Sequence, residues 1–399
     1  MGHTLTSAQA ADRLGVKQET LYAYVSRGLL SVSRAADGRR SLFDPSEVER
    51  LARRGRPRRS THGPTIDVSI RTAITRMTAA GPLYRGHPAS VLACTASFEQ
   101  VAELLWSGSL PAEHREWPPA ETGLPFPADG MPALERLRLT VALAGAQERL
   151  RDAPPDALGR SLVSAMVGAF PALGERVPRL HLEGGVQPLR ASVAGRLVNR
   201  LVPGRPPAGL VEAVNGALVL LADHELAVST LAARVAASTR ADVVSCVSAA
   251  LGPMAGPLHG TASRRARALL DDVAERGAVR AVTAHLTRSG RLPGFGHVLY
   301  PDVDPRARVL LDLLAEVRTA RRTLRLVDDV AAEGVARGAG HPNVDLVLAA
   351  LGHATGMAPD AAEPIFVVAR TAGWIAHALE EYDERPLRFR ARAAYVGPN

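Results

Sequence analysis

The feature that most constrains the fold is a long series of helical segments that begins near residue 68 and continues almost to the C-terminus. Apolar residues recur there at helical spacing, and proline-rich connections such as residues 117–119 and 153–155 separate the segments. The segments contain no sustained strand alternation and no internal repeat. Aromatic residues make up only 4% of the chain, and its apolar residues are mainly Ala, Leu and Val. The pattern therefore predicts an all-α fold of closely packed helices.

The size of the chain and its apolar content predict more than one folding unit. A length of 399 residues with 46% hydrophobic residues is typical of two or three units with a large core. No apolar run approaches the roughly 18 residues that a membrane helix needs, and the N-terminus lacks the apolar stretch of a signal peptide. We therefore expect a soluble, cytoplasmic protein that has no membrane partner.

Residues 1–52 have a pattern of their own, which predicts two short helices joined by a tight turn. Thr6 and Gln9 resemble a capping box, so the first helix is expected over Ser7–Leu14 and the second over residues 17–27. The dipeptide Asp37-Gly38 predicts a hairpin, and Asp44 is placed to cap a third helix. Residues 53–65, rich in Arg, Gly and Pro, are interpreted as a basic linker, and the large domain is expected over residues 66–399.

Positive charge is concentrated at this end of the chain. Residues 1–62 hold twelve Arg and Lys against six Asp and Glu, which is a net +6 of the chain's +8. A concentrated basic segment is typical of proteins that bind a polyanion. Lys occurs only once, at Lys17, so the excess of Arg can also reflect coding bias. The charge is therefore supporting evidence only.

The first 52 residues resemble the winged helix-turn-helix modules of the MerR and excisionase type. In such a module the second helix enters the major groove of DNA and the wing reaches the phosphate backbone. The resemblance implies that the groove would be contacted by Gln18, Glu19, Tyr22 and Arg27, and the phosphates by Arg34, Arg39, Arg40 and the arginines of residues 53–59. The alternative is that a DNA-binding fold serves here for packing or protein interaction. We expect DNA to be a partner.

Four segments of the large domain place His, Asp or Arg where side chains can converge on a cleft. They are Asp223-His224-Glu225 within a helical stretch, Leu258-His259-Gly260 before a helix over about residues 261–276, Gly294-Phe295-Gly296-His297 followed by Asp304-Pro305-Arg306, and Asn343-Val344-Asp345 before an apolar run. The helix dipole would keep His259 neutral and able to donate a hydrogen bond to an oxyanion, and Asp304 would cap a helix. Taken singly, each also has a structural interpretation, with Asp345 as an N-cap and Arg306 as a solvated first-turn residue.

Together and in this order, the four segments resemble the citrate synthase family. Residues 81–88 and 97–106 are similar to its opening region, residues 369–377 to a later block and residues 390–398 to its C-terminal Arg-Pro-Arg segment, so the resemblance covers about residues 66–399. It implies large and small helical domains that close over a cleft, with a small subdomain at about residues 260–363.

The resemblance also implies an activity: condensation of acetyl-CoA with oxaloacetate, followed by hydrolysis of citryl-CoA to citrate and CoA. Asp345 would remove a methyl proton from acetyl-CoA while His259 donates a hydrogen bond to the thioester oxygen, and His297 would polarise and protonate the ketone of oxaloacetate. Acetyl-CoA is a substrate here, and neither a metal nor a cofactor is implied.

Substrate-binding positions follow from the same resemblance. Oxaloacetate would be bound by His224, Arg306, Arg370 and Arg390. Arg390 would reach into the site of a partner subunit, so a homodimer is implied. The turn of Gly294, Phe295 and Gly296 would approach the adenine of CoA. Arg264 and Arg265 are physically plausible partners for the CoA phosphates, although no family motif matches them.

Several positions depart from the family pattern. They are Ala227 in place of Asn, Thr261 and Ser263 in a turn that usually contains Gly and Asn, Val298 in place of Arg, and Ala391 in place of Pro. Two alternatives therefore stay open beside the citrate synthase reading. One is a 2-methylcitrate synthase that uses propionyl-CoA, since one methylene is worth only about 1–3 kcal/mol in a pocket. The other is a DNA-binding regulator whose large domain senses a CoA ester or a dicarboxylate.

Overall fold

The computed structural model describes most of the chain. The described residues are 5–14, 16–26, 29–34, 41–45, 47–48, 51, 69–120, 130–146, 153–173, 179–183, 191–256, 260, 262–391, 395 and 397. Contacts divide the chain into two compact units, Met1–Arg71 and Thr72–Asn399. The predicted linker, residues 53–65, lies outside the described residues.

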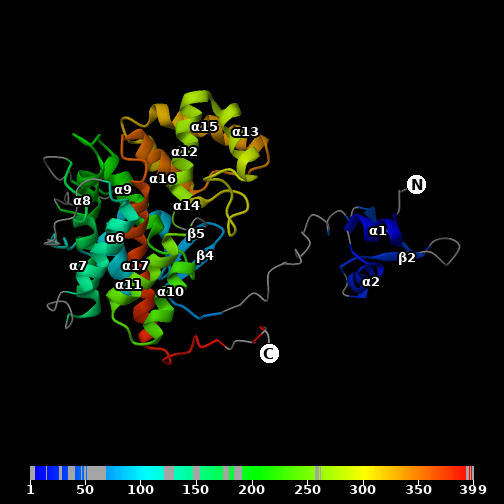
Figure 1. Cartoon of the computed structure of the whole chain (residues 1–399), viewed down its shortest axis with the longest axis horizontal. Coiled ribbons are helices and arrows are strands. Elements are labelled where there is room, and N and C mark those ends of the chain that lie inside the picture. The colour runs from blue at the N-terminus through cyan, green and yellow to red at the C-terminus, as the bar shows by residue number, and fades with distance from the viewer. Residues whose placement is uncertain are drawn as a thin grey trace. The chain divides into compact units, whose positions relative to one another are not determined.

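The N-terminal unit combines two helices with a small antiparallel sheet (Figure 1). Its elements are β1 (Leu5–Thr6), α1 (Ser7–Leu14), α2 (Gln18–Ser26), β2 (Val32–Arg34) and β3 (Ser41–Phe43), and the strand order is β1-β3-β2. The predicted cap is present, because the Thr6 amide donates to Gln9 Oε1 at 3.0 Å and the Gln9 amide donates to Thr6 Oγ1 at 3.4 Å. Leu21 and Phe43 are buried in the core of this unit.

Strands β2 and β3 pair as the predicted hairpin requires. Val32 lies opposite Phe43 and Arg34 lies opposite Ser41. The connecting turn with Asp37 and Gly38 lies outside the described residues. The strands that flank the turn are thus arranged as a wing, and residues 45, 47, 48 and 51 are helical, where the third helix is expected.

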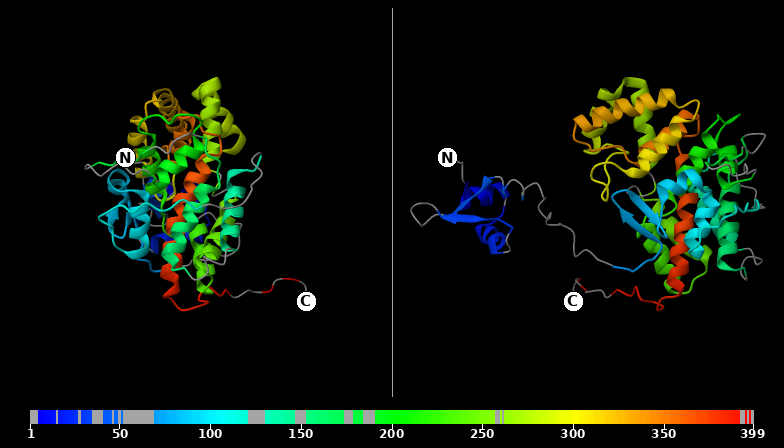
Figure 2. Two further views of the ribbon diagram at one scale, coloured as in Figure 1. Left: turned by 90° about the vertical axis from the view of Figure 1, so that its left-hand side faces the viewer. Right: turned by 180° about the vertical axis from the view of Figure 1, so that it is seen from behind.

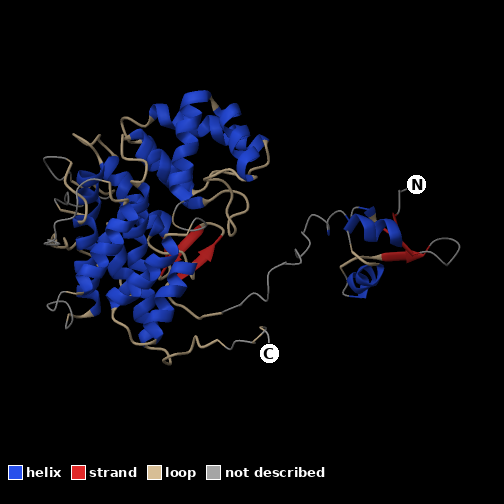
Figure 3. Cartoon of the chain, viewed as in Figure 1, coloured by secondary structure: helices blue, strands red, loops and turns tan. Residues whose placement is uncertain are grey.

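The second unit is mostly helical, as predicted (Figure 3). A first group of helices comprises α4 (Ala89–Thr95), α5 (Phe98–Ser107), α6 (Ala133–Gly145), α7 (Pro155–Gly168), α8 (Val193–Leu201), α9 (Leu210–Leu221), α10 (Val228–Ser238), α11 (Val243–Met254) and α17 (Ala362–Tyr382). A second group comprises α12 (Ala262–Arg276), α13 (Ala278–Ser289), α14 (Pro305–Ala315), α15 (Arg321–Ala336) and α16 (Val344–Ala354). Figure 1 shows α12, α13, α15 and α16 together at one end of this unit. None of the described helices is both long and apolar enough to cross a membrane.

The helix α17 runs through the middle of this unit (Figure 2). It contacts α5, α6, α7, α9, α10 and α11. Nearly all of its side chains are buried, as expected for a helix that is apolar on every face. Gly373 allows its close approach to the end of α9, since a Cβ there would lie 2.6 Å from the backbone oxygen of Ala222. The polar residues of α17 are thereby held against the residues that follow α9.

The second unit also contains a small sheet beside its helices. Strands β4 (Thr75–Thr78), β5 (Gly81–Tyr84) and β6 (His87–Pro88) form an antiparallel sheet in that order. Each strand has at most four residues, which is too short for alternation to stand out in the sequence. The sheet has a role at the site described below, because the Tyr84 hydroxyl donates to the backbone oxygen of Asp223 at 3.1 Å.

Candidate active site

His224 lies in the connection between α9 and α10, so the prediction that it belongs to a helical stretch is wrong. α9 ends at Leu221, and the chain turns at Glu225, which has a left-handed φ of 55°. The Glu225 amide donates to Asp223 Oδ2 at 3.1 Å, which stabilises the turn. The sequence hid this turn because the apolar run of α9 leads into it without a Gly or Pro.

Three rings come together at this turn. The ring centroids of His224 and His297 are 5.2 Å apart in an edge-to-face arrangement. The ring of Tyr300 stacks on His297 at 4.9 Å with an interplanar angle of 28°, and the Arg306 guanidinium carbon lies 5.6 Å from the Tyr300 centroid. His224, which is distant in sequence, thus meets His297 and Arg306 around one tyrosine.

Asp304 fixes the position of Arg306. Its carboxylate caps α14 by accepting from the Arg306 amide at 3.0 Å, as predicted, and also binds the Arg306 guanidinium through two bonds of 3.0 and 2.9 Å. The same carboxylate accepts from the Val344 amide at 3.1 Å. Because Asp304 joins the first turns of α14 and α16, it holds Arg306 and Asp345 in a fixed relation.

Asn343, rather than Asp345, caps α16. The Asn343 side chain accepts from the Asp345 amide at 3.0 Å and donates to the backbone oxygen of Gly296 at 2.9 Å. The backbone N–H of Asn343 donates to the backbone oxygen of Gly294 at 2.9 Å. Gly294 has a φ of +77°, and a Cβ there would lie 2.7 Å from the Cβ of Leu346, so only glycine fits. The Asp345 carboxylate is therefore not used as a cap and is available for chemistry.

Arg370 is a buried cation of α17. Its side chain is 2% exposed, and its Nε donates to the backbone oxygen of Leu221 at 2.9 Å. The guanidinium lies over the ring of Phe366, with the carbon 4.9 Å from the centroid. This bond and stacking contact fix its orientation, and one edge of the planar group remains for a ligand.

The electrostatics of the site favour neutral imidazoles. Burial lowers the pKa of His224 to about 2, and the positive charges of Arg306 and Arg370 contribute to the shift. Burial and Arg306 also lower the pKa of His297. The Leu299 amide donates to His297 Nδ1 at 3.1 Å, so the single proton of the neutral ring is on Nε2. His297 is therefore a hydrogen-bond donor without being a cation.

Asp345 is less accessible to water than an ordinary surface carboxylate. Burial raises the pKa of its carboxyl, while the charges of Arg306 and Arg370 oppose the shift. A carboxylate with a raised pKa is a stronger base than a solvated one. The site thus brings together a base, a neutral donor and two guanidinium groups suited to carboxylates.

A family model described as "Citrate synthase, C-terminal domain" matches residues 67–392. The chain belongs to the citrate synthase family. Membership of this family makes the chain an acyltransferase-type enzyme. A second model, described as "Helix-turn-helix domain", matches residues 4–56.

Individual relatives agree with this assignment. The chain is 32% identical over 343 residues to "Citrate synthase 2" of Bacillus subtilis, covering 79% of this chain and 90% of the relative. It is 30% identical over 339 residues to "2-methylcitrate synthase" of Shewanella oneidensis, covering 79% of this chain and 89% of that relative. A solved citrate synthase from Thermotoga maritima matches with a TM-score of 0.64 and 26% identity, covering 85% of this chain and 96% of that one.

The other candidate residues of the large domain have different surroundings. His259 and Thr261 lie outside the described residues. Arg264 and Arg265 are both exposed, and Arg264 donates to Glu363 at 2.9 Å, so an ion pair within the chain already engages Arg264. Arg390 is exposed, and no described residue of its own chain pairs with it.

Two departures from the family pattern have visible local consequences. Ala227 is the N-cap of α10 and has no side chain to accept from the first turn, a bond that the usual Asn can make. Val298 is 97% exposed, so its side chain lies in solvent, where the usual Arg would place a positive charge.

In the N-terminal module, Gln18 and Tyr22 lie on α2 and are exposed, Tyr22 by 45%. The Tyr22 hydroxyl is within hydrogen-bond distance of Ser7 Oγ, at 3.1 Å. Arg27, Arg39 and Arg40 lie outside the described residues, as does the side chain of Arg34.

Sequence reasoning missed two groups of residues that lie at or behind the candidate site. One is Tyr300, whose only signal was its place between His297 and Arg306. The other is a buried chain of polar contacts behind His224. In it His377 Nε2 lies 3.4 Å from Asp223 Oδ2, Arg234 Nη1 lies 2.9 Å from His377 Nδ1, and Arg234 Nε donates to Glu381 at 2.8 Å. These contacts fix Asp223 and thereby the turn that carries His224.

Proposed function

We propose that this member of the citrate synthase family condenses acetyl-CoA with oxaloacetate and hydrolyses the citryl-CoA intermediate to citrate and CoA. The observation that carries the proposal is the convergence of Asp345, His297 and His224 with the buried Arg306 and Arg370 on one site. A binding domain needs the arginines, but it has no need of a general base beside a neutral hydrogen-bond donor. The same convergence therefore argues against a large domain that only senses a ligand.

In the proposed reaction Asp345 removes a proton from the methyl carbon of acetyl-CoA. Its raised pKa brings its basicity closer to that of the carbon acid, which favours proton transfer. His259, as a neutral donor to the thioester oxygen, would stabilise the enol or enolate. The product of this step is a carbon nucleophile that forms only while both groups act together.

The nucleophile then attacks the ketone carbon of oxaloacetate, and His297 supplies the proton. Its Nε2–H polarises the carbonyl, and the proton passes to the alkoxide oxygen as the carbon–carbon bond forms. The two carboxylates of oxaloacetate bind to Arg306 and Arg370 and to Arg390 of a partner subunit, with His224 as a further donor. Water then hydrolyses the thioester of citryl-CoA.

The CoA moiety is proposed to lie against the turn of Gly294, Phe295 and Gly296. The glycines have φ values of +77° and +69°, which lets the backbone approach a planar base closely. Arg265 is a better candidate than Arg264 for a CoA phosphate, because Glu363 already neutralises Arg264.

Propionyl-CoA is a second candidate substrate, and the similarity of the chain to a 2-methylcitrate synthase supports this alternative. An equimolar mixture of acetyl-CoA and propionyl-CoA, incubated with oxaloacetate and the protein, tests the choice. We expect citrate to exceed 2-methylcitrate by mass spectrometry. A majority of 2-methylcitrate would assign the chain to the propionyl-CoA reaction instead.

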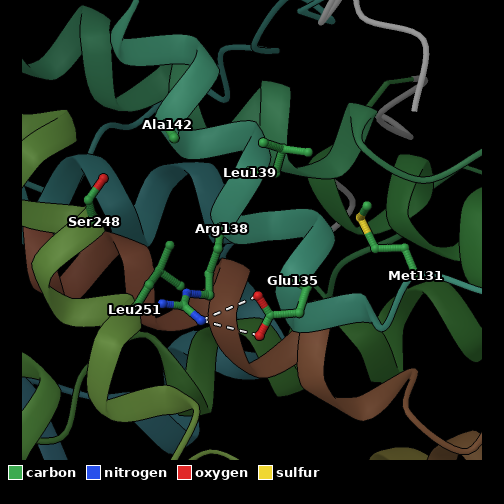
Figure 4. A pocket seen from close by; sticks show the side chains of 7 residues that line it. All are labelled: Met131, Glu135, Arg138, Leu139, Ala142, Ser248 and Leu251. Atoms are coloured by element: carbon green, nitrogen blue, oxygen red, sulfur yellow. Dashed lines mark hydrogen bonds and ion pairs between the residues drawn. The ribbon is translucent and has the colours of Figure 1, made fainter. Parts of the chain in front are cut away.

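A homodimer is proposed on two grounds. The first is that Arg390 has no partner in its own chain among the described residues. The second is an open groove of about 540 Å³ beside α6 and α11 (Figure 4). It is lined by Met131, Glu135, Arg138, Leu139, Ala142, Ser248 and Leu251. Leu139 is 39% exposed there, and a second copy of the chain would bury it.

Mixing two inactive variants tests the shared site. Asp345→Asn and Arg390→Leu are each expected to be nearly inactive alone. In a mixed dimer one site combines an intact Asp345 with an intact Arg390 from the partner, so co-refolding or co-expression should restore activity toward a quarter of the wild-type level. The exposed Arg385→Leu serves as a control that stays active alone. No recovery in dimers shown to be mixed would place Arg390 outside the partner's site.

DNA is proposed as a partner of the N-terminal module. The match to a helix-turn-helix model, the exposed α2 and the net +6 charge of residues 1–62 support this. If the module contacts DNA, duplex affinity should fall steeply between low and physiological salt, because phosphate contacts release counterions. We expect Arg39→Ala with Arg40→Ala to weaken binding to all sequences, and Gln18→Ala to relax sequence preference.

A duplex-binding titration of the full-length chain at several salt concentrations measures the salt dependence of DNA affinity. The control is the chain without residues 1–62, which should lose DNA binding and keep condensation activity. Equal retention of DNA by both proteins would refute a role of the module in DNA binding.

A further inference from the structure

The Tyr300 hydroxyl is a buried polar group without a partner. The residue is 4% exposed, and its oxygen has no hydrogen-bond partner among the described residues. A buried hydroxyl without a bond is rare in folded proteins because it loses its hydrogen bonds to water without replacement. Such a group at a binding site indicates that a ligand supplies the missing partner.

The ring of Tyr300 lies in the middle of the candidate active site. It stacks on His297 at 4.9 Å, meets the edge of His224 at 6.4 Å and lies under the Arg306 guanidinium at 5.6 Å. The residue therefore contacts the proposed acid and a proposed carboxylate-binding cation at once. The sequence motifs assign no role to Tyr300.

A second group without a partner lies beside it. His224 Nε2 is buried and has no hydrogen-bond partner among the described residues. Both unpartnered atoms belong to rings of the same cluster, and two guanidinium groups perturb the pKa of His224 from nearby. An unpartnered hydroxyl, an unpartnered imidazole nitrogen and two cations in one place suit a small molecule with several oxygens and negative charge, which describes a dicarboxylate.

We propose that Tyr300 is a further substrate-binding residue of this site, whose hydroxyl donates a hydrogen bond to an oxygen of the dicarboxylate while its ring holds the His297 imidazole in position. The inference rests on the proposed function for the identity of that dicarboxylate, oxaloacetate. Burial raises the pKa of Tyr300, so the hydroxyl keeps its proton and remains a donor at neutral pH.

Two variants separate the hydroxyl from the ring. Tyr300→Phe removes only the donor, so the KM for oxaloacetate should rise about tenfold to a hundredfold while the KM for the acyl-CoA and kcat change little. Tyr300→Leu also removes the stacking on His297, so kcat should fall as well. Tyr24→Phe, in the N-terminal unit, is the matched control and should behave as wild type.

Thermal unfolding distinguishes binding from a structural role. Because the hydroxyl has no partner in the unliganded protein, Tyr300→Phe should leave the Tm unchanged or raise it. Stabilisation by saturating oxaloacetate should be weaker in this variant than in the wild type. A lowered Tm without ligand, together with an unchanged KM, would overturn the inference.

Calorimetric titration with oxaloacetate alone keeps this test separate from the proposed reaction. If the wild type binds oxaloacetate but does not turn over acyl-CoA, the proposed function fails, and the titration still decides on Tyr300. Equal affinity of the wild type and Tyr300→Phe would refute the proposed hydrogen bond. An affinity about tenfold or more lower in the variant would support it.

Discussion

Replacing Asp345 by Asn is expected to lower kcat for condensation by about a thousandfold. The amide has nearly the same shape and keeps the first turn of α16, whose cap is Asn343, so the fold should not change. What is lost is the base that removes the methyl proton. Oxaloacetate affinity, measured by calorimetric titration, should stay within a few fold of wild type, since the arginines are untouched.

The pH dependence provides an independent check on Asp345. The deprotonated carboxylate is the active form, and burial raises its pKa. The rate should therefore rise with pH through a pKa above the ordinary range of Asp, and this acid limb should be absent from the residual activity of the variant. Near-normal turnover by Asp345→Asn would exclude the proposed mechanism.

Replacing Arg370 by Leu should have a large effect on substrate binding rather than on the chemical step. Removing one partner of a buried, hydrogen-bonded charge pair costs about 2–5 kcal/mol. Since about 1.4 kcal/mol is a factor of ten, the KM for oxaloacetate should rise at least about thirtyfold. Steady-state kinetics with oxaloacetate varied at saturating acyl-CoA measures this.

Two matched variants refine the Arg370 experiment. Arg370→Lys keeps the positive charge but loses the planar guanidinium, so its KM for oxaloacetate should lie between those of Arg370→Leu and the wild type. Arg385→Leu removes an exposed arginine and should have no effect on this KM. A KM for oxaloacetate unchanged in Arg370→Leu would mean that the buried guanidinium serves packing alone.

The sequence predicted the helical fold because its helices depend on local pattern. The helix Ser7–Leu14 follows from a capping box and apolar spacing, and Ala262–Arg276 lies where the segment after Gly260 is expected to be helical. Asp304 occupies the cap that its place before Pro305 indicates. Ordered motifs then brought His297, Arg306, Asp345 and Arg370 into one hypothesis, although no periodicity could show that they meet.

What could not be predicted depends on contacts between distant segments. The turn at His224 is made by the left-handed Glu225 and by the packing of Gly373, neither of which has a local signal. The role of Asp304 in joining Arg306 to the start of α16 requires Val344, forty positions away in the chain. Tyr300 stands out only once its ring is seen against His297 and its hydroxyl is seen to lack a partner.

The central claim is that this chain carries out condensation of an acyl-CoA with oxaloacetate. The most direct measurement is the release of free CoA thiol by the purified full-length protein from acetyl-CoA, with and without oxaloacetate. We expect release that depends on oxaloacetate, yields citrate in equal amount and disappears in Asp345→Asn. No oxaloacetate-dependent release from acetyl-CoA or propionyl-CoA, by a protein that still binds oxaloacetate, would contradict the claim and leave a ligand-sensing role for the large domain.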